Sequence, residues 1–393
     1  MARFKVLVLN QIGASGLKRL PVETYTTGKD IADPDAVLVR SADMHAMEVA
    51  PSVKAIGRAG AGTNNIPVKA MSGRGVPVFN APGANANAVK ELVLAGMLVA
   101  ARNLAPALRF VDQLDLVAAD LHKAVEEGKK TFTGHELAGH TLGIIGLGKI
   151  GCLVADAAIK LGMSVLGYDP EITVDAAWSL PSQVKKAGSV ADVLKNAHFI
   201  SLHVPLVEAT RDLINDKNIA LARAGAVLLN FSREGVVSNA AVLTALGRGQ
   251  LGWYVCDFPS GKIVGHPKVV ALPHLGASTR EAEENCATLV ADQLRDYLEH
   301  GNIVNAVNFP SVSMARESRF RIAIANANVP NMLGQISTAM AQAGLNIHTM
   351  VNKSRGDMAY TLVDVDSAVS DSVIAALKRI GGVLAVRYLP YAE

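Results

Sequence analysis

The chain of 393 residues has few charges and almost no imbalance between them. Charged residues make up 19% of the sequence, and 38 lysines and arginines against 35 aspartates and glutamates leave a formal net charge of +3. No run of five or more like charges occurs. The sequence therefore lacks the clustered positive charge typical of nucleic-acid binding. Its 50% hydrophobic content excludes a mostly disordered chain, and its length predicts two or three domains with separate cores.

Cysteines and long hydrophobic runs are also scarce. Cys152, Cys256 and Cys286 form no CxxC pair, so we expect neither a zinc site nor a redox dithiol, and a reducing cytoplasm fits. The most apolar stretch, 92–101, has ten residues, whereas a membrane span needs about 20. The apolar run near the N-terminus has four residues, too few for a signal peptide. We therefore expect a cytoplasmic protein with no metal, no membrane contact and no nucleic-acid partner.

Short apolar runs alternate with helical patterns, which predicts parallel sheets with crossover helices. Strands are expected at 4–9, 36–39, 53–55 and 76–79, and again at 141–145, 164–168, 199–204, 226–230, 253–256 and 269–272. Helices are expected at 87–102, 150–161 and 280–300. The segment 302–313 contains Pro310 and reads as a linker. Beyond it, a β-α-β-β-α-β order is expected from segments 320–325, 332–343, 347–352, 360–364, 372–380 and 383–388.

A GxGxxG pattern, Gly146-Leu-Gly148-Lys149-Ile150-Gly151, follows one predicted strand and opens a helix. Glycine here permits a tight turn and lets the backbone approach a pyrophosphate, whose charge the helix N-terminus favours. Asp169 ends the next strand, 18 residues after Gly151, where a carboxylate binds ribose hydroxyls and repels a 2′-phosphate. The pattern predicts NAD rather than NADP; a glycine-rich loop without a ligand is the alternative.

Further segments occur in an order that resembles the D-2-hydroxyacid dehydrogenases. They are Leu202-His-Val-Pro-Leu206 with Thr210-Arg211, Asn230-Phe-Ser-Arg233, Pro273-His-Leu-Gly-Ala-Ser-Thr279, Arg58-Ala-Gly-Ala-Gly62 and Asn80-Ala-Pro82. The resemblance covers essentially the whole chain and narrows to the branch that oxidises 3-phospho-D-glycerate with NAD, at the entry to serine synthesis, and carries an ACT domain.

The resemblance implies an α/β fold with two Rossmann-like doubly wound parallel-sheet domains and a C-terminal ferredoxin-like (ACT, βαββαβ) domain. It also implies that the substrate-binding domain is built from two separate segments of the chain. The expected ranges are 1–98 with 289–312 for a substrate-binding domain, 99–288 for an NAD-binding domain and 318–393 for a regulatory ACT domain.

The chemistry of such a site needs one cation and one base. Arg233 offers a planar fork for a substrate carboxylate and a forming ketone, and His274 can take the hydroxyl proton. The alternatives are that Arg233 only forms an ion pair at the surface, and that His274 is a loop histidine whose hydrogen bonds are all made within the protein. By resemblance, the substrate also contacts Arg40, Arg58, Gly60, Ala61 and Gly62. The implied cofactor contacts are Gly146, Gly148, Lys149, Ile150, Gly151, Asp169, His203, Val204, Pro205, Thr210, Ser232, Asp257 and Gly276.

The chain departs from the family where a glutamate usually hydrogen-bonds the catalytic histidine. Aligning Asp257 places Lys262 at that position, and an ammonium near His274 would favour a neutral imidazole. Lys262 could instead be the base itself, which makes it a third candidate catalytic residue, or it could lie on a solvated loop. Glu234 stands where the family has glycine; it is either a partner for His274 or an ion-pair partner of Arg233.

Asn326, Asn328 and Asn346 resemble the ACT loops that bind an amino acid at a subunit interface. Serine is therefore an expected effector, and a homodimer or homotetramer an expected assembly; an ACT domain that only dimerises is the alternative. Two other functions stay open: another D-2-hydroxyacid dehydrogenase with a different small-molecule substrate, and an NAD-sensing regulatory protein without turnover.

Overall fold

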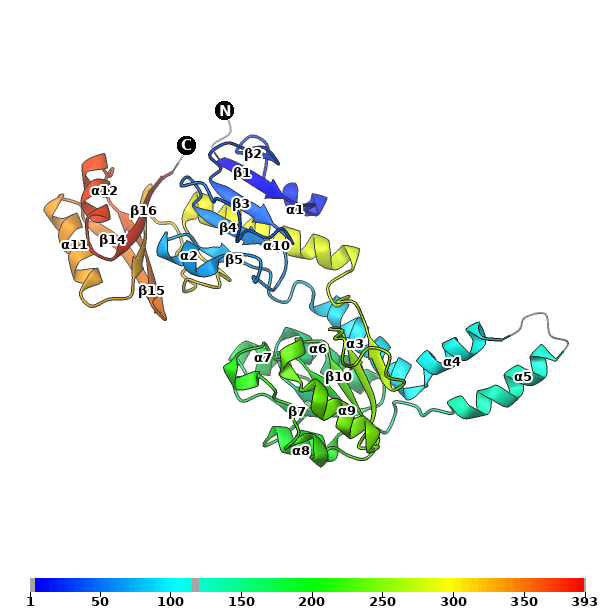
Figure 1. Cartoon of the computed structure of the whole chain (residues 1–393). Helices are drawn as coiled ribbons and strands as arrows, with labels where there is room; N and C mark the ends of the chain where they lie inside the picture. The colour runs from blue at the N-terminus through cyan, green and yellow to red at the C-terminus, as the bar shows by residue number, and fades with distance from the viewer. Residues whose placement is uncertain (1–3, 115–119, 392–393) are drawn as a thin grey trace. The chain divides into compact units, whose positions relative to one another are not determined.

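The computed structural model describes residues 4–114 and 120–391. They form two compact units: Met1–Asn85 with Arg280–Glu393 is the first, and Ala86–Thr279 is the second (Figure 1). The ends of the predicted domain ranges, 1–3 and 392–393, lie outside the described residues. The chain thus leaves the first unit once and returns to it.

The N-terminal part of the first unit is a parallel sheet of five strands in the order β2-β1-β3-β4-β5. This is a doubly wound order. Strands β1 and β3 have the predicted bounds, whereas the sequence does not predict β2, whose Tyr-Thr-Thr-Gly stretch is polar at the sheet edge. The bounds are Phe4–Leu9 (β1), Tyr25–Gly28 (β2), Ala36–Val39 (β3), Ala55–Arg58 (β4) and Val78–Phe79 (β5), with helices Ala14–Leu17 (α1) and Val68–Gly73 (α2) between them.

Two strand predictions in this sheet begin too early. β4 begins at Ala55 and not at Val53, because the Val53 N–H donates to the Ala50 carbonyl (3.2 Å) in a turn. β5 begins at Val78, because Pro77 has no N–H to donate to a sheet.

Helix α10 (Arg280–His300) has the predicted bounds and packs on this sheet through a glycine. A Cβ on Gly57 of β4 would lie 2.5 Å from Val290 Cγ1 and 2.8 Å from Leu294 Cδ1, both on α10. Val290 and Leu294 are fully buried. Glycine in mid-strand is therefore explained by close approach of the helix.

The C-terminal part of the first unit is an antiparallel sheet in the order β14-β15-β13-β16. It confirms the predicted β-α-β-β-α-β order, the ferredoxin-like arrangement. The bounds are Phe320–Ala327 (β13), Met332–Gln342 (α11), Ile347–Arg355 (β14), Met358–Val365 (β15), Asp371–Lys378 (α12) and Val383–Pro390 (β16).

This antiparallel sheet shares a core with the C-terminal end of α10, and one hydrophobic cluster includes Leu362 and Leu389 of the sheet and Tyr297 and Leu298 of the helix. Arg387 donates to the carbonyls of Tyr297 (3.0 Å) and Leu298 (2.8 Å). The last carbonyls of α10, which have no partner within a helix, are thus satisfied by the sheet.

The connecting segment 302–313 is not the free linker that its composition predicts. It forms no helix or extended ladder, yet Ile303, Phe309 and Val312 are fully buried. Ile303 and Val312 exchange two backbone hydrogen bonds of 2.8 and 2.9 Å. Its apolar residues fill the core next to α10 without a regular period, which is why periodicity does not reveal them.

The second unit contains a parallel sheet of seven strands in the order β12-β11-β10-β9-β6-β7-β8. Strands β6, β7 and β10 have the predicted bounds. The strands are Thr141–Ile145 (β6), Ser164–Tyr168 (β7), Lys185–Lys186 (β8), Phe199–Leu202 (β9), Ala226–Asn230 (β10), Leu251–Cys256 (β11) and Val269–Ala271 (β12). Its helices include Ala86–Ala101 (α3), Lys149–Lys160 (α6), Val174–Ser179 (α7), Val190–Asn196 (α8) and Asn239–Gly247 (α9), of which the sequence predicts α3 and α6.

Two helices that the sequence does not predict, Leu104–Asp112 (α4) and Leu121–Gly128 (α5), extend away from this sheet (Figure 1). Phe110, near the end of α4, packs against Phe132, which follows α5, with ring centroids 5.4 Å apart. Among the described residues, no single helix has the length and apolar character of a membrane span. Helices α3 and α4 together meet that criterion by length and composition alone, with a 69° bend between them.

Candidate nucleotide and substrate site

The glycine-rich turn lies between β6 and α6, beside the end of β9. Gly146 has φ +95, and a Cβ there would lie 2.5 Å from the His203 carbonyl oxygen. A Cβ on Gly151 would overlap the Gly146 carbonyl, whereas nothing lies within 4 Å of one on Gly148. The turn is therefore closed toward the protein and open in front of the α6 N-terminus, which fits a pyrophosphate. Lys149 is exposed and Ile150 half-buried at the same turn.

Asp169 follows β7 and faces the same turn. Its Oδ2 accepts a hydrogen bond from the Leu147 N–H (2.8 Å), and its Oδ1 accepts one from the Glu171 N–H (2.9 Å). Each oxygen keeps further acceptor capacity. Asp169 is 22 residues from Leu147 in sequence, and a direct hydrogen bond fixes its carboxylate next to the turn. In this position the ribose hydroxyls of a bound dinucleotide could donate to it.

The carboxyl end of β9 supplies the other side of this crevice, since β6 and β9 are neighbours at the point where the strand order reverses. Burial lowers the pKa of His203 to about 4, and its Nε2 lies 2.9 Å from Ser201 Oγ. Thr210 Oγ1 accepts from the Val207 N–H (2.9 Å) and donates to the Pro205 carbonyl (2.5 Å). Val204 is half-buried and Pro205 exposed, so this loop offers a surface with a fixed shape.

Arg233 is held by a turn at the end of β10. The fully buried Asn230 donates to the Arg233 carbonyl (2.9 Å) and accepts from the N–H (3.2 Å) and Oγ (2.9 Å) of Ser232. Arg233 Nη1 donates to the Ser232 carbonyl (2.6 Å), which leaves most guanidinium N–H groups for other partners. The sequence does not reveal this positioning role of Asn230, because a polar residue ending a strand is common.

His274 is held by Asp257, whose side chain is almost completely buried after β11. Asp257 Oδ1 accepts from the Leu275 N–H (2.7 Å), and Oδ2 accepts from the Gly276 N–H (2.8 Å). The His274 N–H donates to the Asp257 carbonyl (3.1 Å). His274 has φ +57, a left-handed conformation uncommon outside glycine, and its ring lies 4.8 Å from that of Phe258. Asp257 thus fixes the loop that presents the imidazole.

Two of the three predicted catalytic residues, Arg233 and His274, therefore lie at one edge of the sheet. Arg233 follows β10 and His274 follows β12, with Asp257 after the intervening β11. Carboxyl ends of parallel strands form the ligand-binding edge in such folds. Lys262 lies in the turn after Asp257 and is exposed. Within the described part of the chain, no hydrogen bond or ion pair joins Lys262 to His274 or Arg233.

The first unit carries Arg40 after β3 and Arg58 at the end of β4, again at neighbouring carboxyl ends. Gly60 has φ +155, and a Cβ there would overlap the Arg58 guanidinium, so a larger residue at this position would force the Arg58 side chain to move. Arg40 Nη2 donates to Glu283 Oε1 of α10 (2.5 Å). The sequence does not reveal this pair, because its members are 243 residues apart.

The rest of the predicted substrate segment is a fixed turn. Asn80 Nδ2 donates to the Ala61 carbonyl (2.6 Å), and the Ala81 N–H donates to the Gly60 carbonyl (2.9 Å). Gly62 is half-buried beside them. The structure thus brings the Arg58 to Gly62 segment and Asn80 together.

The predicted effector asparagines do not meet within one chain. The Asn328 N–H donates to the Asp357 carbonyl (2.8 Å) just before β15, whereas the Asn346 N–H donates to Asp366 Oδ1 (3.3 Å) just after it. These ends of β15 are roughly 25 Å apart at about 3.3 Å per residue. Within a single chain, one amino acid therefore cannot contact both Asn328 and Asn346. Asn326 is buried, and its Nδ2 donates to the Ala327 carbonyl (2.8 Å).

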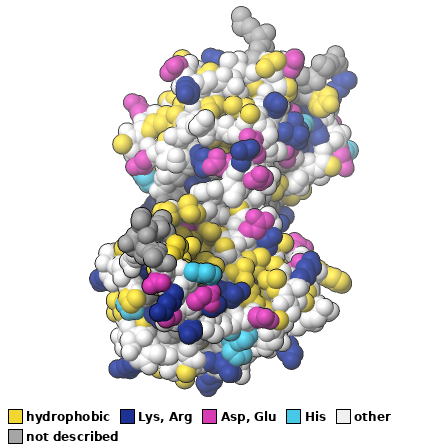
Figure 2. Space-filling model, turned by 90° about the vertical axis from the view of Figure 1, so that its right-hand side faces the viewer, with side chains coloured by type: hydrophobic (Ala, Val, Ile, Leu, Met, Phe, Trp, Pro, Cys, Tyr) yellow, Lys and Arg dark blue, Asp and Glu magenta, His cyan; other side chains and the backbone are white. Residues whose placement is uncertain are grey.

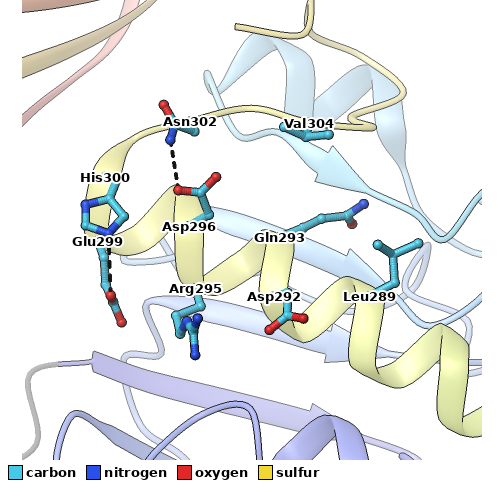
Figure 3. A pocket seen from close by; sticks show the side chains of 9 residues that line it. All are labelled: Leu289, Asp292, Gln293, Arg295, Asp296, Glu299, His300, Asn302 and Val304. Carbon is cyan, nitrogen blue, oxygen red and sulfur yellow. Dashed lines mark hydrogen bonds and ion pairs between the residues drawn. The ribbon is translucent and has the colours of Figure 1, made fainter. Parts of the chain in front are cut away.

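A separate cavity of about 330 Å³ lies beside the C-terminal half of α10 (Figure 3). Its carboxylates already have partners: Asn302 Nδ2 donates to Asp296 (2.9 Å), and Glu299 lies 3.8 Å from His300 Nε2. Its lining includes no glycine turn or helix N-terminus, so it lacks the features of a nucleotide site. The lining residues are Leu289, Asp292, Gln293, Arg295, Asp296, Glu299, His300, Asn302 and Val304.

Comparison with known proteins agrees with this geometry. Residues 94–276 match the family model of the D-isomer specific 2-hydroxyacid dehydrogenase, NAD binding domain. The D-3-phosphoglycerate dehydrogenase of Haemophilus influenzae is 33% identical over 356 residues, which cover 87% of this chain and 83% of that protein. That of Methanocaldococcus jannaschii is 35% identical over 325 residues, 80% of this chain and 59% of that protein.

Solved structures share the fold. The TT0316 protein from Thermus thermophilus has a TM-score of 0.62 and 26% identity, over 77% of this chain and 99% of that one. An NAD+-bound 3-phosphoglycerate dehydrogenase of Entamoeba histolytica has a TM-score of 0.59 and 24% identity, over 78% of this chain and 99% of that one. The predicted α/β fold and the predicted NAD cofactor are confirmed. The chain belongs to the D-isomer specific 2-hydroxyacid dehydrogenase family and is an NAD-dependent dehydrogenase.

Proposed function

We propose that the protein oxidises 3-phospho-D-glycerate to 3-phosphohydroxypyruvate, the first step of serine synthesis, in the cytoplasm. The observation that carries this choice of substrate is the pair of guanidinium groups, Arg40 and Arg58, at the carboxyl ends of β3 and β4. Two cations at one sheet edge suit a phosphate dianion. The relatives named D-3-phosphoglycerate dehydrogenase support the same substrate.

In the proposed reaction, Arg233 binds the substrate carboxylate and stabilises the oxygen that becomes a ketone. The imidazole of His274 accepts the hydroxyl proton and returns it in the reverse direction. Bound NAD supplies the acceptor for the hydride. Asp257 is a positioning residue, because its carboxylate holds the backbone after His274. We keep Lys262 as a proposed third catalytic residue: it is either the base or a charge that favours neutral His274.

A second candidate substrate class is a 2-hydroxy acid without phosphate. The Arg40–Glu283 ion pair favours it, because the carboxylate already balances one of the two cations. Following absorbance of the reduced cofactor with NAD and a panel of D-2-hydroxy acids separates the two. We expect turnover with 3-phospho-D-glycerate above that with D-glycerate and D-lactate; the reverse order would select the second class.

Replacing Asp169 with alanine should lower the preference for NAD over NADP by at least about tenfold. A charge-assisted hydrogen bond to ribose is lost, and so is the repulsion of a 2′-phosphate. The measurement is kcat/KM for both cofactors. Asp175→Ala, in the first turn of α7, removes an exposed carboxylate of the same unit and should leave the ratio unchanged. An unaltered ratio in Asp169→Ala would remove this carboxylate from the ribose site.

We propose that the chain forms a homo-oligomer, a dimer or a tetramer, through α4. Leu104, Leu108 and Val111 are 40%, 65% and 52% exposed and share one face of this helix. In Figure 1, α4 and α5 extend toward the right. Figure 2 views that right-hand side and shows hydrophobic side chains gathered on it. Exposed apolar stripes of this kind are typical of interaction surfaces.

Leu108→Asp should therefore shift the molecular mass measured by light scattering to that of one chain, or from tetramer to dimer. The control Gln113→Asp adds the same charge on the other side of the helix and should leave the mass unchanged. An unchanged mass in Leu108→Asp would exclude α4 from the interface.

Serine binding by the C-terminal sheet is a further proposal, and it requires such an assembly. Asn328 and Asn346 lie at opposite ends of β15, so one ligand could contact both only if they came from different chains. Calorimetry with serine on the full-length protein tests it.

A further inference from the structure

The ion pair of Arg40 with Glu283 places an acidic side chain directly on a cation assigned to the substrate. The Nη2 to Oε1 distance is 2.5 Å, and the two side chains are 36% and 39% exposed. The backbone around Arg40 is held in place: Asn65 Nδ2 donates to the carbonyl of Ala42 (2.7 Å), and the Ala42 N–H donates to Asn10 Oδ1 (2.6 Å). The guanidinium thus stands at a fixed position, with a carboxylate on one of its nitrogens.

Helix stability does not require this carboxylate at position 283. An acidic residue in the first turn of a helix is favourable, but Glu281 already supplies one there. Glu284 serves the packing of α1, because its Oε2 accepts from the Ser15 N–H (2.9 Å). Glu283 differs from both of these neighbours in that its carboxylate meets a cation at the sheet edge.

Arg40 and Arg58 lie at the carboxyl ends of neighbouring strands, and Glu283 is paired with Arg40. Burial raises the pKa of the Cys286 thiol, one turn after Glu283, while the charges of Arg58 and Arg40 lower it and that of Glu283 raises it. Because Glu283 Oε1 lies 2.5 Å from Arg40 Nη2, a phosphate dianion that binds the same guanidinium would come within a few ångströms of the Glu283 carboxylate. Like charges at such a distance repel, and the partly buried setting screens them less than bulk water does.

We propose that Glu283 is a specificity residue, whose carboxylate occupies Arg40 in place of the substrate's anionic tail and so restrains the affinity for phosphate-bearing 2-hydroxy acids. It has no such effect on substrates with an uncharged tail. This inference rests on the proposed role of Arg40 and Arg58 in phosphate binding. It adds that the Glu283 carboxylate of the same chain competes with the substrate phosphate for Arg40.

The test is the dissociation constant of 3-phospho-D-glycerate, measured by calorimetry on the full-length protein. Glu283→Gln keeps the shape and removes the charge, so it should tighten binding by about three- to tenfold. Binding of D-glycerate should change by less than about twofold. The matched control is Glu281→Gln, which removes the same charge from an exposed side chain in the same helical turn and should leave both constants unchanged.

A double variant shows whether the effect passes through Arg40. In an Arg40→Leu background, Glu283→Gln should no longer tighten 3-phospho-D-glycerate binding, because no guanidinium is left to release. Weaker binding in Glu283→Gln alone would overturn the proposal and make Glu283 a positioning residue for Arg40. Equal gains for phosphorylated and unphosphorylated ligands, or no gain, would also overturn it. Turnover is measured separately, so a failure of the proposed reaction appears as binding without cofactor reduction.

Discussion

Replacing His274 with alanine should lower kcat for hydroxy-acid oxidation by about 10²- to 10⁴-fold, the range expected when a positioned general base is removed. The cofactor should still bind with nearly unchanged affinity, because the change removes only the imidazole and leaves the glycine turn, Asp169 and the hydrogen bonds from Leu275 and Gly276 to Asp257 in place. Stopped-flow measurement of kcat and fluorescence titration of NADH separate the two effects. The control is His122→Ala, which removes an exposed histidine of α5 from the same unit.

Lys262→Ala decides the role of the exposed lysine in the same assay. A loss of kcat similar to that of His274→Ala would support a catalytic group of Arg233, Lys262 and His274. Near-normal kcat, with an unchanged pH dependence of turnover, would leave Lys262 as a loop residue. Turnover that survives in His274→Ala would contradict the assignment of the base.

Replacing Arg321 with alanine should destabilise the first unit by about 3–5 kcal/mol, because it leaves a buried carboxylate without its partner. Arg321 and Asp364 are both 0% exposed, and their two hydrogen bonds are 2.7 and 2.9 Å long. Arg321 Nη1 also donates to the His300 carbonyl (3.1 Å), at the end of α10. The pair thus joins the antiparallel sheet to α10, and its loss should lower Tm by roughly 10 °C in calorimetry.

Two variants control for a general effect of removing an arginine. Arg19→Ala breaks an exposed pair with Asp292 and should change Tm little. The double variant Arg321→Met with Asp364→Leu fills the same space with apolar groups and should recover part of the loss. If Arg321→Ala unfolds at the same temperature as the unaltered protein, the pair does not hold this junction.

The same pair gives the stability a defined pH dependence. Burial alone would raise the pKa of Asp364, but hydrogen bonds from Arg321 and the Glu317 N–H, together with the charge of Arg321, outweigh it and lower the pKa. A lowered pKa in the folded state stabilises the fold fully above the unfolded value of about 3.9. The stabilisation is lost as the pH falls below that value toward the folded pKa. Arg321→Ala should therefore be much less sensitive to this acidic range.

The buried strands and the glycine turn could be predicted from the sequence because their signals are local. β6, β7 and β10 are five-residue strands made mainly of apolar residues, and their bounds agree with the structure. β2 and helices α4 and α5 could not be predicted in this way, because they are polar or exposed and bury little on one face. The 302–313 segment could not be predicted as part of the core either, although part of it is buried, because its buried residues follow neither a helical nor a strand period.

The sequence predicts individual candidate residues of the site, but it does not predict the contacts that these residues make. Arg40, Arg58, Arg233 and His274 all occur at carboxyl ends of strands, as expected for this fold. Long-range partners such as Glu283 leave no mark in the local sequence, because helix α10 returns to the first sheet only after the whole second unit. The division into substrate-binding, NAD-binding and ACT domains at the predicted boundaries stays a prediction, since it concerns what each part binds.

The most direct test of the proposed function is the steady-state reduction of NAD by the purified protein with 3-phospho-D-glycerate, next to D-glycerate and D-lactate. We expect kcat/KM for the phosphorylated substrate to exceed that of the other two by at least about tenfold, with Arg58→Leu removing most of this difference and Arg233→Leu abolishing turnover of all three. Equal kcat/KM values for all three acids, or a phosphate preference that survives in Arg58→Leu, would contradict the assignment of the sheet edge at β3 and β4 to a phosphate.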